Sequence, residues 1–284
     1  MSPARPAVAQ DASELEAFYR RYLASSMFPL MNLRDHGCIG GEALRAMRVW
    51  VSGDPIRGAM GLTTEGVAMP QIPHPGDCTD LIEQLRGETL IGLIGAADQV
   101  AAIMEQLDLG LAPMQLNTVD PLFELHLNDL IEPHLEGLEL FPLRSASDSV
   151  LLGWRAAYRR DTLGETLATA QLKAVEDVTA YMARDTHRVL FKDGQPVALT
   201  GFNASLPDVV QIGAVYVPPE LRCNGYARAA VALQLLEARR KGVSRSILFA
   251  ANEPAERAYR ALGYRQIGDY SLVMFSAPQK IPAQ

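Results

Sequence analysis

The 284-residue sequence has few cysteines and no apolar run long enough to cross a membrane. Its three cysteines, Cys38, Cys78 and Cys223, lie far apart without a Cys-x-x-Cys spacing, which argues against a disulfide framework and against a zinc site. A membrane helix needs roughly 18 to 20 apolar residues, and no stretch reaches that length. The first ten residues contain no apolar segment, so we expect no secretory signal, no membrane partner, no metal site and a cytoplasmic location.

Lysine is also scarce, and all four lysines lie after residue 137. Residues 1–137 contain eight arginines and 19 carboxylates, a net charge of −11, whereas residues 138–284 contain 18 basic and 14 acidic residues, a net charge of +4. This asymmetry fits two units with different surfaces, although a drift in surface composition would produce the same counts. The positive half has no run that mixes basic and aromatic residues, so we expect no nucleic-acid partner.

The chain is 48% hydrophobic and 21% charged, which is typical of a globular protein that buries a core, and its length suits one large domain or two ordinary ones. Residues 138–284 predict the order β-α-α-β-β-β-α-β-α-β-β. The expected strands are 138–143, 187–191, 196–202, 209–217, 246–250 and one or two within 264–275, and the expected helices are 148–160, 169–183, 225–240 and 253–262.

Residues 1–137 also predict a mixture of helices and strands. A helix is expected at 12–24, strands at 46–51, 56–63 and 89–94, and a helix that continues to Leu107. Residues 89–107 resemble 244–262 at an offset of 155, which places Met104 on Tyr259. Such a weak repeat indicates either a duplicated domain or a chance similarity.

The segment Val217-Pro-Pro-Glu-Leu-Arg-Cys-Asn-Gly-Tyr-Ala-Arg-Ala-Ala230 joins a predicted strand to an alanine-rich helix. Its two prolines cannot donate backbone hydrogen bonds, so strand pairing ends there. Gly225 permits a positive φ, and the free N–H groups at the start of the following helix form a cradle that suits a pyrophosphate. The segment lacks a Gly-Lys-Ser/Thr sequence and the GxGxxG pattern. On these grounds alone, an anion site and an ordinary strand–helix connection both remain open.

Two motifs resemble the signatures of one known family. Arg222-Cys-Asn-Gly-Tyr-Ala227 is similar to the Arg/Gln-x-x-Gly-x-Gly/Ala signature of the GCN5-related N-acetyltransferases, the GNAT superfamily. Asn252-Glu-Pro-Ala-Glu-Arg-Ala-Tyr-Arg-Ala-Leu-Gly-Tyr264 resembles the family's second signature. The resemblance implies an α/β (α+β) protein with the acyl-CoA N-acyltransferase fold, a mixed and mostly antiparallel sheet, and two similar domains in tandem. Residues 138–284 would be the catalytic domain and 1–137 a degenerate GNAT-like copy.

The resemblance also implies roles for individual residues. Backbone amides of the turn would bind the pyrophosphate of acetyl-CoA, and the preceding strand would pair with its pantetheine arm. Tyr259 would donate a proton to the departing thiolate, although a tyrosine at this position also suits a core. Asn252 is expected to cap its helix, to contact pantetheine, or both. The implied cofactor-binding residues are Val215, Tyr216, Val217, Arg222, Cys223, Asn224, Gly225, Tyr226, Ala227, Arg228, Asn252, Ala255 and Tyr259.

These residues predict an acetyl-CoA-dependent N-acetyltransferase. A primary amine of a small-molecule or peptide acceptor would attack the thioester directly. Residues 222–265 contain nine basic residues against three glutamates, which would attract a phosphate-rich cofactor. No general base stands out, and Asp208, Tyr216, Glu253 and His187 are candidates by position only. Another acyl group, another acceptor, or a CoA-binding regulatory module without turnover remain alternatives, and the oligomeric state stays open.

Overall fold

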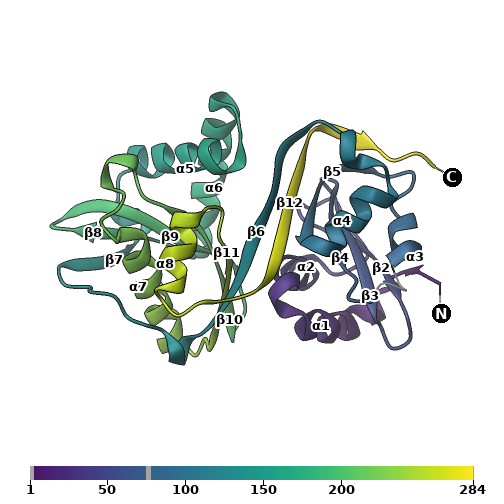
Figure 1. The fold of residues 1–284 in the computed structure, drawn as a ribbon, viewed down its shortest axis with the longest axis horizontal. Helices are drawn as coiled ribbons and strands as arrows, with labels where there is room; N and C mark the ends of the chain where they lie inside the picture. The colour runs from purple at the N-terminus through teal and green to yellow at the C-terminus, as the bar shows by residue number, and fades with distance from the viewer. Residues whose placement is uncertain (1–2, 75–77, 284) are drawn as a thin grey trace. The chain divides into compact units, whose positions relative to one another are not determined.

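The computed structural model describes residues 3–74 and 78–283, and the chain divides into two compact units (Figure 1). Unit 1 comprises Met1–Asp120 and Gly268–Gln284, and unit 2 comprises Pro121–Ile267. This division differs from the expected boundary between residues 137 and 138. The reason is that two long strands, β6 and β12, each have residues in both units, so the C-terminal segment completes the first unit.

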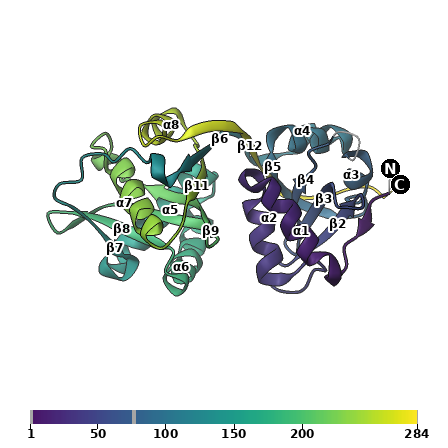
Figure 2. The same ribbon diagram turned by 90° about the horizontal axis from the view of Figure 1, so that it is seen from below.

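Unit 1 contains a mixed sheet with helices packed against it (Figure 2). Strand order within the unit is β1-β2-β3-β4-β5-β12, in which only β4 and β5 are parallel. Its elements are β1 (Arg5–Pro6), α1 (Ala12–Arg21), α2 (Leu23–His36), β2 (Met47–Ser52), β3 (Gly58–Thr63), β4 (Val67–Gln71), α3 (Cys78–Glu83), β5 (Thr89–Ala96), α4 (Ala97–Gln106), the first part of β6 (Met114–His126) and most of β12 (Arg265–Lys280).

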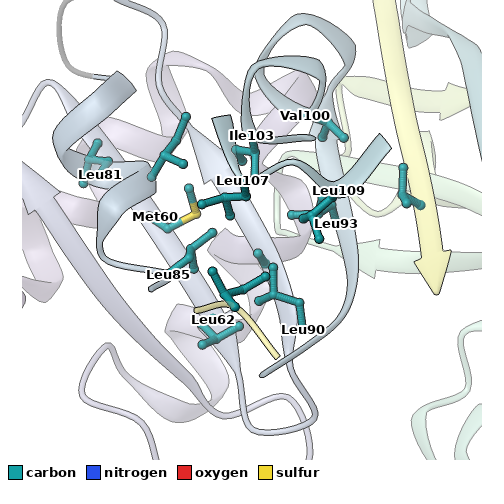
Figure 3. Close-up of a cluster of buried hydrophobic side chains, with 14 of the residues drawn as sticks. Met60, Leu62, Leu81, Leu85, Leu90, Leu93, Val100, Ile103, Leu107 and Leu109 are labelled. Carbon is teal, nitrogen blue, oxygen red and sulfur yellow. The ribbon is translucent and has the colours of Figure 1, made fainter. Parts of the chain in front are cut away.

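One apolar core of unit 1 lies between its sheet and the helices α3 and α4. Figure 3 shows side chains from β3 and β5 meeting those of the two helices, among them Met60, Leu93 and Ile103, all of which are fully buried. Burying a side chain of this size stabilises the fold by about 1.5–3 kcal/mol. This apolar contact explains why segments with modest local propensity form a defined unit.

Unit 2 has the strand order β6-β11-β10-β9-β8-β7, in which only β10 and β11 are parallel. Its elements are β7 (Leu138–Pro142), α5 (Asp148–Leu163), α6 (Leu167–Arg184), β8 (His187–Lys192), β9 (Gln195–Ser205), β10 (Val209–Tyr216), a 3-10 turn at Pro219–Leu221, α7 (Tyr226–Arg240), β11 (Arg245–Phe249) and α8 (Glu253–Arg260). The β8–β9 hairpin turns at Asp193-Gly194, where both residues have positive φ angles, as the Asp-Gly sequence predicts.

Two apolar clusters show which helices cover each face of the unit 2 sheet. Side chains of α5 and α6 pack with Val189, Leu199 and Tyr216 on one face. Side chains of α7 and α8 pack with Ile212 and Leu248 on the other. The sheet thus has an α5/α6 face and an α7/α8 face.

The two units have the same topology. Each has two helices, three antiparallel strands, a helix, a parallel strand and a further helix. The antiparallel strand beside the parallel one is β12, the last strand of the chain, in unit 1, and β6, which precedes the other elements of the unit, in unit 2. The repeat at an offset of 155 corresponds to β5–α4 and β11–α8. The prediction of two similar α/β domains with mixed, mostly antiparallel sheets is therefore confirmed.

Several details differ from the sequence-based expectation. The helix predicted at 12–24 ends at Arg21, and a second helix, α2, follows it directly. Of the one or two strands expected within 264–275 the structure has one, β12, and it continues to Lys280 because residues 270–280 pair along β5. No strand was expected at β6, which pairs with β11 through residues 122–126. None of the helices in the described residues combines the length and apolar content that crossing a bilayer requires.

Candidate functional site

The turn between β10 and α7 exposes a row of backbone amides. Cys223 and Gly225 have φ angles of 67° and 78°, and Gly225 precedes α7 without any side-chain cap. Within the described residues, the N–H groups of 223–228 donate to no backbone or side-chain acceptor, whereas the Ala229 N–H bonds to the Gly225 carbonyl at 3.0 Å. Six free amides at a helix N-terminus form a concentrated site for an anion.

Side chains fix this turn and give it a positive charge. Asn224 Nδ2 donates to the Leu221 and Arg222 carbonyls at 3.1 and 3.2 Å, and Arg222 Nε donates to the Val217 carbonyl at 3.1 Å. The Arg228 guanidinium lies beside Gly225, and its buried Nε has no partner among the described residues. The turn therefore combines free amides with two guanidinium groups.

The strand that leads into the turn separates from its parallel neighbour. β10 pairs with β11 only from Val209 to Gln211, and Gln211 lies opposite Ile247. β10 then continues to Tyr216 with a register shift relative to β9, and Ala214 has a φ of 53°. A bulge of this kind increases the local bend of a strand. Among the described residues, the edge of β10 from residue 212 onward therefore has no strand partner on the β11 side, and its pairing with a ligand near 215–217 stays a prediction.

Helix α8 begins beside this edge. Asn252 Oδ1 accepts a hydrogen bond from the Ala255 N–H at 3.0 Å, so Asn252 caps the helix as predicted. Ala255 packs against the same apolar cluster as Val215, on the α7/α8 face. The second motif and the end of β10 thus border the same apolar cluster of unit 2.

Tyr259, the expected proton donor, lies on α8. It is buried in the α7/α8 cluster, and its ring lies edge-on to Tyr264 with 5.9 Å between ring centroids. Burial, with a smaller contribution from Tyr158, raises the pKa of the Tyr259 phenol well above its usual value. The hydroxyl therefore stays protonated at neutral pH, which suits a proton donor.

The four candidate bases occupy different places. Asp208 precedes β10 at the end opposite the turn, and Glu253 is exposed and pairs with Arg257. Tyr216 packs with Trp154 on the α5/α6 face, at 6.1 Å between ring centroids, so it lies on the other face of the sheet from Tyr259. His187 is buried on β8. The structure does not gather these four side chains around one point.

Other predicted cofactor-binding residues lie at the start of α7. Cys223, Tyr226 and Ala227 belong to the turn and the first turn of α7, and Lys192 Nζ lies 5.9 Å from the Tyr226 ring centroid. Lys192 was absent from the candidate residues, because it lies 34 positions earlier and only the β8–β9 hairpin brings it here. Gln211, at the end of the β10–β11 pairing, was also missed, since nothing in the sequence marks where two strands separate.

A family model matches this region. The model of the Acetyltransferase (GNAT) family matches residues 153–264, which lie inside unit 2 and include the free-amide turn and α8. This part of the chain is therefore a GNAT domain. No curated protein matches the sequence.

Solved structures share the fold of the whole chain. A tandem GNAT protein from the clavulanic acid biosynthesis pathway has a TM-score of 0.57 and 14% identity, with 97% of this chain and 99% of that one covered. A GCN5-related N-acetyltransferase from Sphaerobacter thermophilus has a TM-score of 0.58 and 16% identity, with 98% and 95% covered. A Drosophila protein has a TM-score of 0.61 and 15% identity, with both chains fully covered. At identities this low, the structural similarity shows a shared fold alone, here the acyl-CoA N-acyltransferase fold in tandem.

Proposed function

We propose that this protein transfers an acetyl group from acetyl-CoA to a primary amine, and that unit 2 carries the site. The observation that supports this most directly is the continuity of two features: the six free amides at residues 223–228 and the unpaired edge of β10 that leads away from them. A pyrophosphate suits the first and an extended amide-bearing arm suits the second. Acetyl-CoA joins these two groups in one molecule and supplies an activated acetyl group as a thioester.

The chain's own residues would share the work of binding. Arg222, Arg228 and the turn amides would hold the pyrophosphate, and Lys192 would add positive charge beside them. Backbone groups of residues 215–217 would pair with the pantetheine arm. Asn252 and Ala255 would line that arm at the start of α8.

Tyr259 would act on the leaving group. When the amine nitrogen attacks, a carbon–nitrogen bond forms and the carbon–sulfur bond breaks. The Tyr259 hydroxyl would give its proton to the sulfur, and the proton lost by the amine would restore the phenol. Burial holds the Tyr259 pKa high, so the donor form is present across the neutral range.

Unit 1 would bind no cofactor, although its topology repeats that of unit 2. The separation between β4 and β5 is filled, because Pro70 packs on Gly95 and cannot donate a backbone hydrogen bond. The amide of Ile72, two residues further along the chain, donates a hydrogen bond to Gln99 Oε1 at 2.7 Å. Unit 1 is therefore proposed to be a degenerate copy. Residues 75–77, which follow β4 in the sequence, lie outside the described residues.

Thiol release from acetyl-CoA across a panel of primary amines tests the proposal. Turnover that is lost in Tyr259→Phe, with CoA still bound, would support an acetyltransferase. Faster turnover with a longer acyl-CoA or with an alcohol would favour a different acyltransferase. CoA binding without turnover of any amine would favour a regulatory module and contradict the proposal.

A further inference from the structure

Two buried polar atoms in the strands of unit 2 have no partner among the described residues, in addition to Arg228 Nε near the free-amide turn. His187 and Gln211 are each 1% exposed, and neither His187 Nε2 nor Gln211 Oε1 has a hydrogen-bond partner among the described residues. Leaving one buried polar group unpaired costs about 1–3 kcal/mol. Neighbouring buried polar groups are satisfied: Thr200 Oγ1, for example, donates to Gln234 Oε1 at 2.8 Å on the α7/α8 face. The two orphaned atoms thus stand out within one sheet.

Both residues lie on the α5/α6 face, around a pair of facing glycines. Gly201 of β9 is in register with His187 on one side and with Gly213 of β10 on the other. The His187 ring, through its Cδ2–Nε2 edge, occupies the space above Gly201 that a Cβ would fill. Gln211 lies two residues before Gly213 and therefore on the same face. The His187 ring and the Asn203 side chain fill the space above the two glycines, and of these two side chains only Asn203 is exposed.

This place is the apex of the opening between β10 and β11. Gln211 is the last residue of β10 that pairs with β11, so an extended arm entering from the free-amide turn ends close to it. The exposed Asn203 side chain lies directly above Gly213. The orphaned atoms therefore lie where a thioester at the tip of the arm would be attacked.

His187 is better suited to accept a hydrogen bond than to take a proton. Burial, together with Arg155 and Arg188, holds its pKa well below the usual range, so the imidazole is neutral at physiological pH. Its Nδ1 lies 2.9 Å from Thr186 Oγ1, and the ring stacks on Tyr181 at 3.5 Å between centroids. With the proton on Nδ1 and directed at Thr186, Nε2 presents a lone pair. Gln211 Oε1 presents another.

We propose that His187 Nε2 and Gln211 Oε1 accept the two N–H bonds of the acceptor's primary amine, after the Asn203 side chain turns aside. A neutral primary amine has two N–H bonds and one lone pair. Two fixed acceptors for its hydrogens would leave the lone pair aimed at the thioester carbon. His187 and Gln211 are thus positioning residues for the nucleophile, an inference that rests on the proposed acetyl transfer.

This arrangement selects one class of acceptor. A secondary amine or an alcohol has a single hydrogen to donate, so one of the two buried atoms would stay unpaired. Sites that leave a buried polar group unpaired reject such analogues strongly. We therefore expect primary amines to be preferred at least tenfold in kcat/KM over their N-methyl counterparts and over matched alcohols.

The test uses the full chain and matched triplets of acceptors, such as phenethylamine, N-methylphenethylamine and 2-phenylethanol, drawn from a broad amine panel. Gln211→Met keeps the side-chain size but removes the acceptor, and Gln211→Glu keeps an oxygen there. Thr200→Val is the control, because it removes a buried hydrogen bond from the opposite face. Thiol release gives KM for the amine and for acetyl-CoA, and thermal unfolding gives Tm.

Gln211→Met should raise the amine KM at least tenfold, leave the acetyl-CoA KM within twofold and leave Tm unchanged or higher, because an unpaired buried group is removed. Gln211→Glu should recover part of the amine binding, and Thr200→Val should lower Tm without changing the amine KM. An unchanged amine KM in Gln211→Met, or equal use of the N-methyl amine, would overturn this inference alone. Absence of turnover with every amine would overturn the proposed function as well.

Discussion

Gln99 of α4 accepts the backbone N–H of Ile72 at 2.7 Å, so in unit 1 a side chain occupies the amide that would otherwise extend the edge of β4. Gln99 is buried. Pro70 of β4, two residues before Ile72, packs on Gly95 of β5. In unit 2 the corresponding edge of β10 is open from residue 212. The two units thus share a topology, but protein side chains fill the opening between β4 and β5 in unit 1, whereas the edge of β10 beside β11 stays unpaired in unit 2.

We therefore expect one CoA site per chain. Titration calorimetry with CoA should give a stoichiometry close to one for the full chain. Gln99→Ala should leave that stoichiometry unchanged, because Pro70 still lacks an N–H group. A stoichiometry near two, or binding that survives the loss of the unit 2 turn, would contradict a degenerate first unit.

The Gly225 turn can be tested with a control at the other end of the same helix. Gly225→Val should weaken CoA binding at least tenfold, because a β-branched residue disfavours the φ of 78° that directs the free amides. We expect a loss of about 1–2 kcal/mol in the free energy of unfolding from the same strain. Calorimetry and urea unfolding measure the two effects.

Gly242→Val separates strain from ligand binding. Gly242 follows α7 with a φ of 94° and no atom within 4 Å of its would-be Cβ, so the strain is comparable. Its effect on unfolding should resemble that of Gly225→Val, while CoA affinity should stay within twofold of the wild type. Equal losses of affinity in both variants would mean that the Gly225 turn has no special part in binding.

The sequence predicts the local elements of this protein better than their partners. Pro218, Pro219 and Gly225 mark the end of β10 and the start of α7, and Asp193-Gly194 marks a hairpin, because these residues restrict or permit particular backbone angles. The assignment of β12 to unit 1 depends instead on pairing between residues 270–280 and β5, far away in the sequence. No local propensity encodes such a partner, so the domain boundary could not be predicted.

The candidate site shows the same limit. Asn252 was predicted as a cap from its place before Glu253 and Pro254, and the structure confirms it. Gln211 gave no signal, and His187 was a candidate base by position only, because what distinguishes the two residues is a side-chain atom without a hydrogen-bond partner among the described residues. A polar residue in an apolar strand is common, and only tertiary structure shows whether it is paired.

Tyr259→Phe should separate catalysis from cofactor binding. The variant keeps the ring that packs in the α7/α8 cluster, so stability and the acetyl-CoA KM should change little. Loss of the proton donor should lower kcat by about 10²–10⁴-fold. Tyr264→Phe is the matched control, because it removes a hydroxyl that lies 2.6 Å from Ser246 Oγ and should affect stability more than kcat. A kcat that stays within twofold in Tyr259→Phe would rule out its role as the acid.

Glu237 should make the stability of unit 2 depend on acid pH. Its carboxylate accepts from Arg188 at 2.8 and 3.0 Å and from Lys241 at 2.6 Å, and these bonds lower its pKa to about 2. An unfolded glutamate titrates near pH 4.3. Because the folded pKa is the lower one, the stabilisation is complete above about pH 4.3 and is lost as the pH falls toward 2.

Glu237→Gln should therefore lower the free energy of unfolding by about 1–3 kcal/mol at pH 7, since Arg188 is nearly buried and loses a charged partner. Urea unfolding at pH 7, 5, 4 and 3 should show the gap between wild type and variant narrowing below pH 4. Glu136→Gln provides the control, because that carboxylate is 87% exposed and its loss should change stability by less than about 0.5 kcal/mol. A gap of equal size at pH 3 and pH 7 would show that packing, rather than the ionised carboxylate, makes Glu237 stabilising.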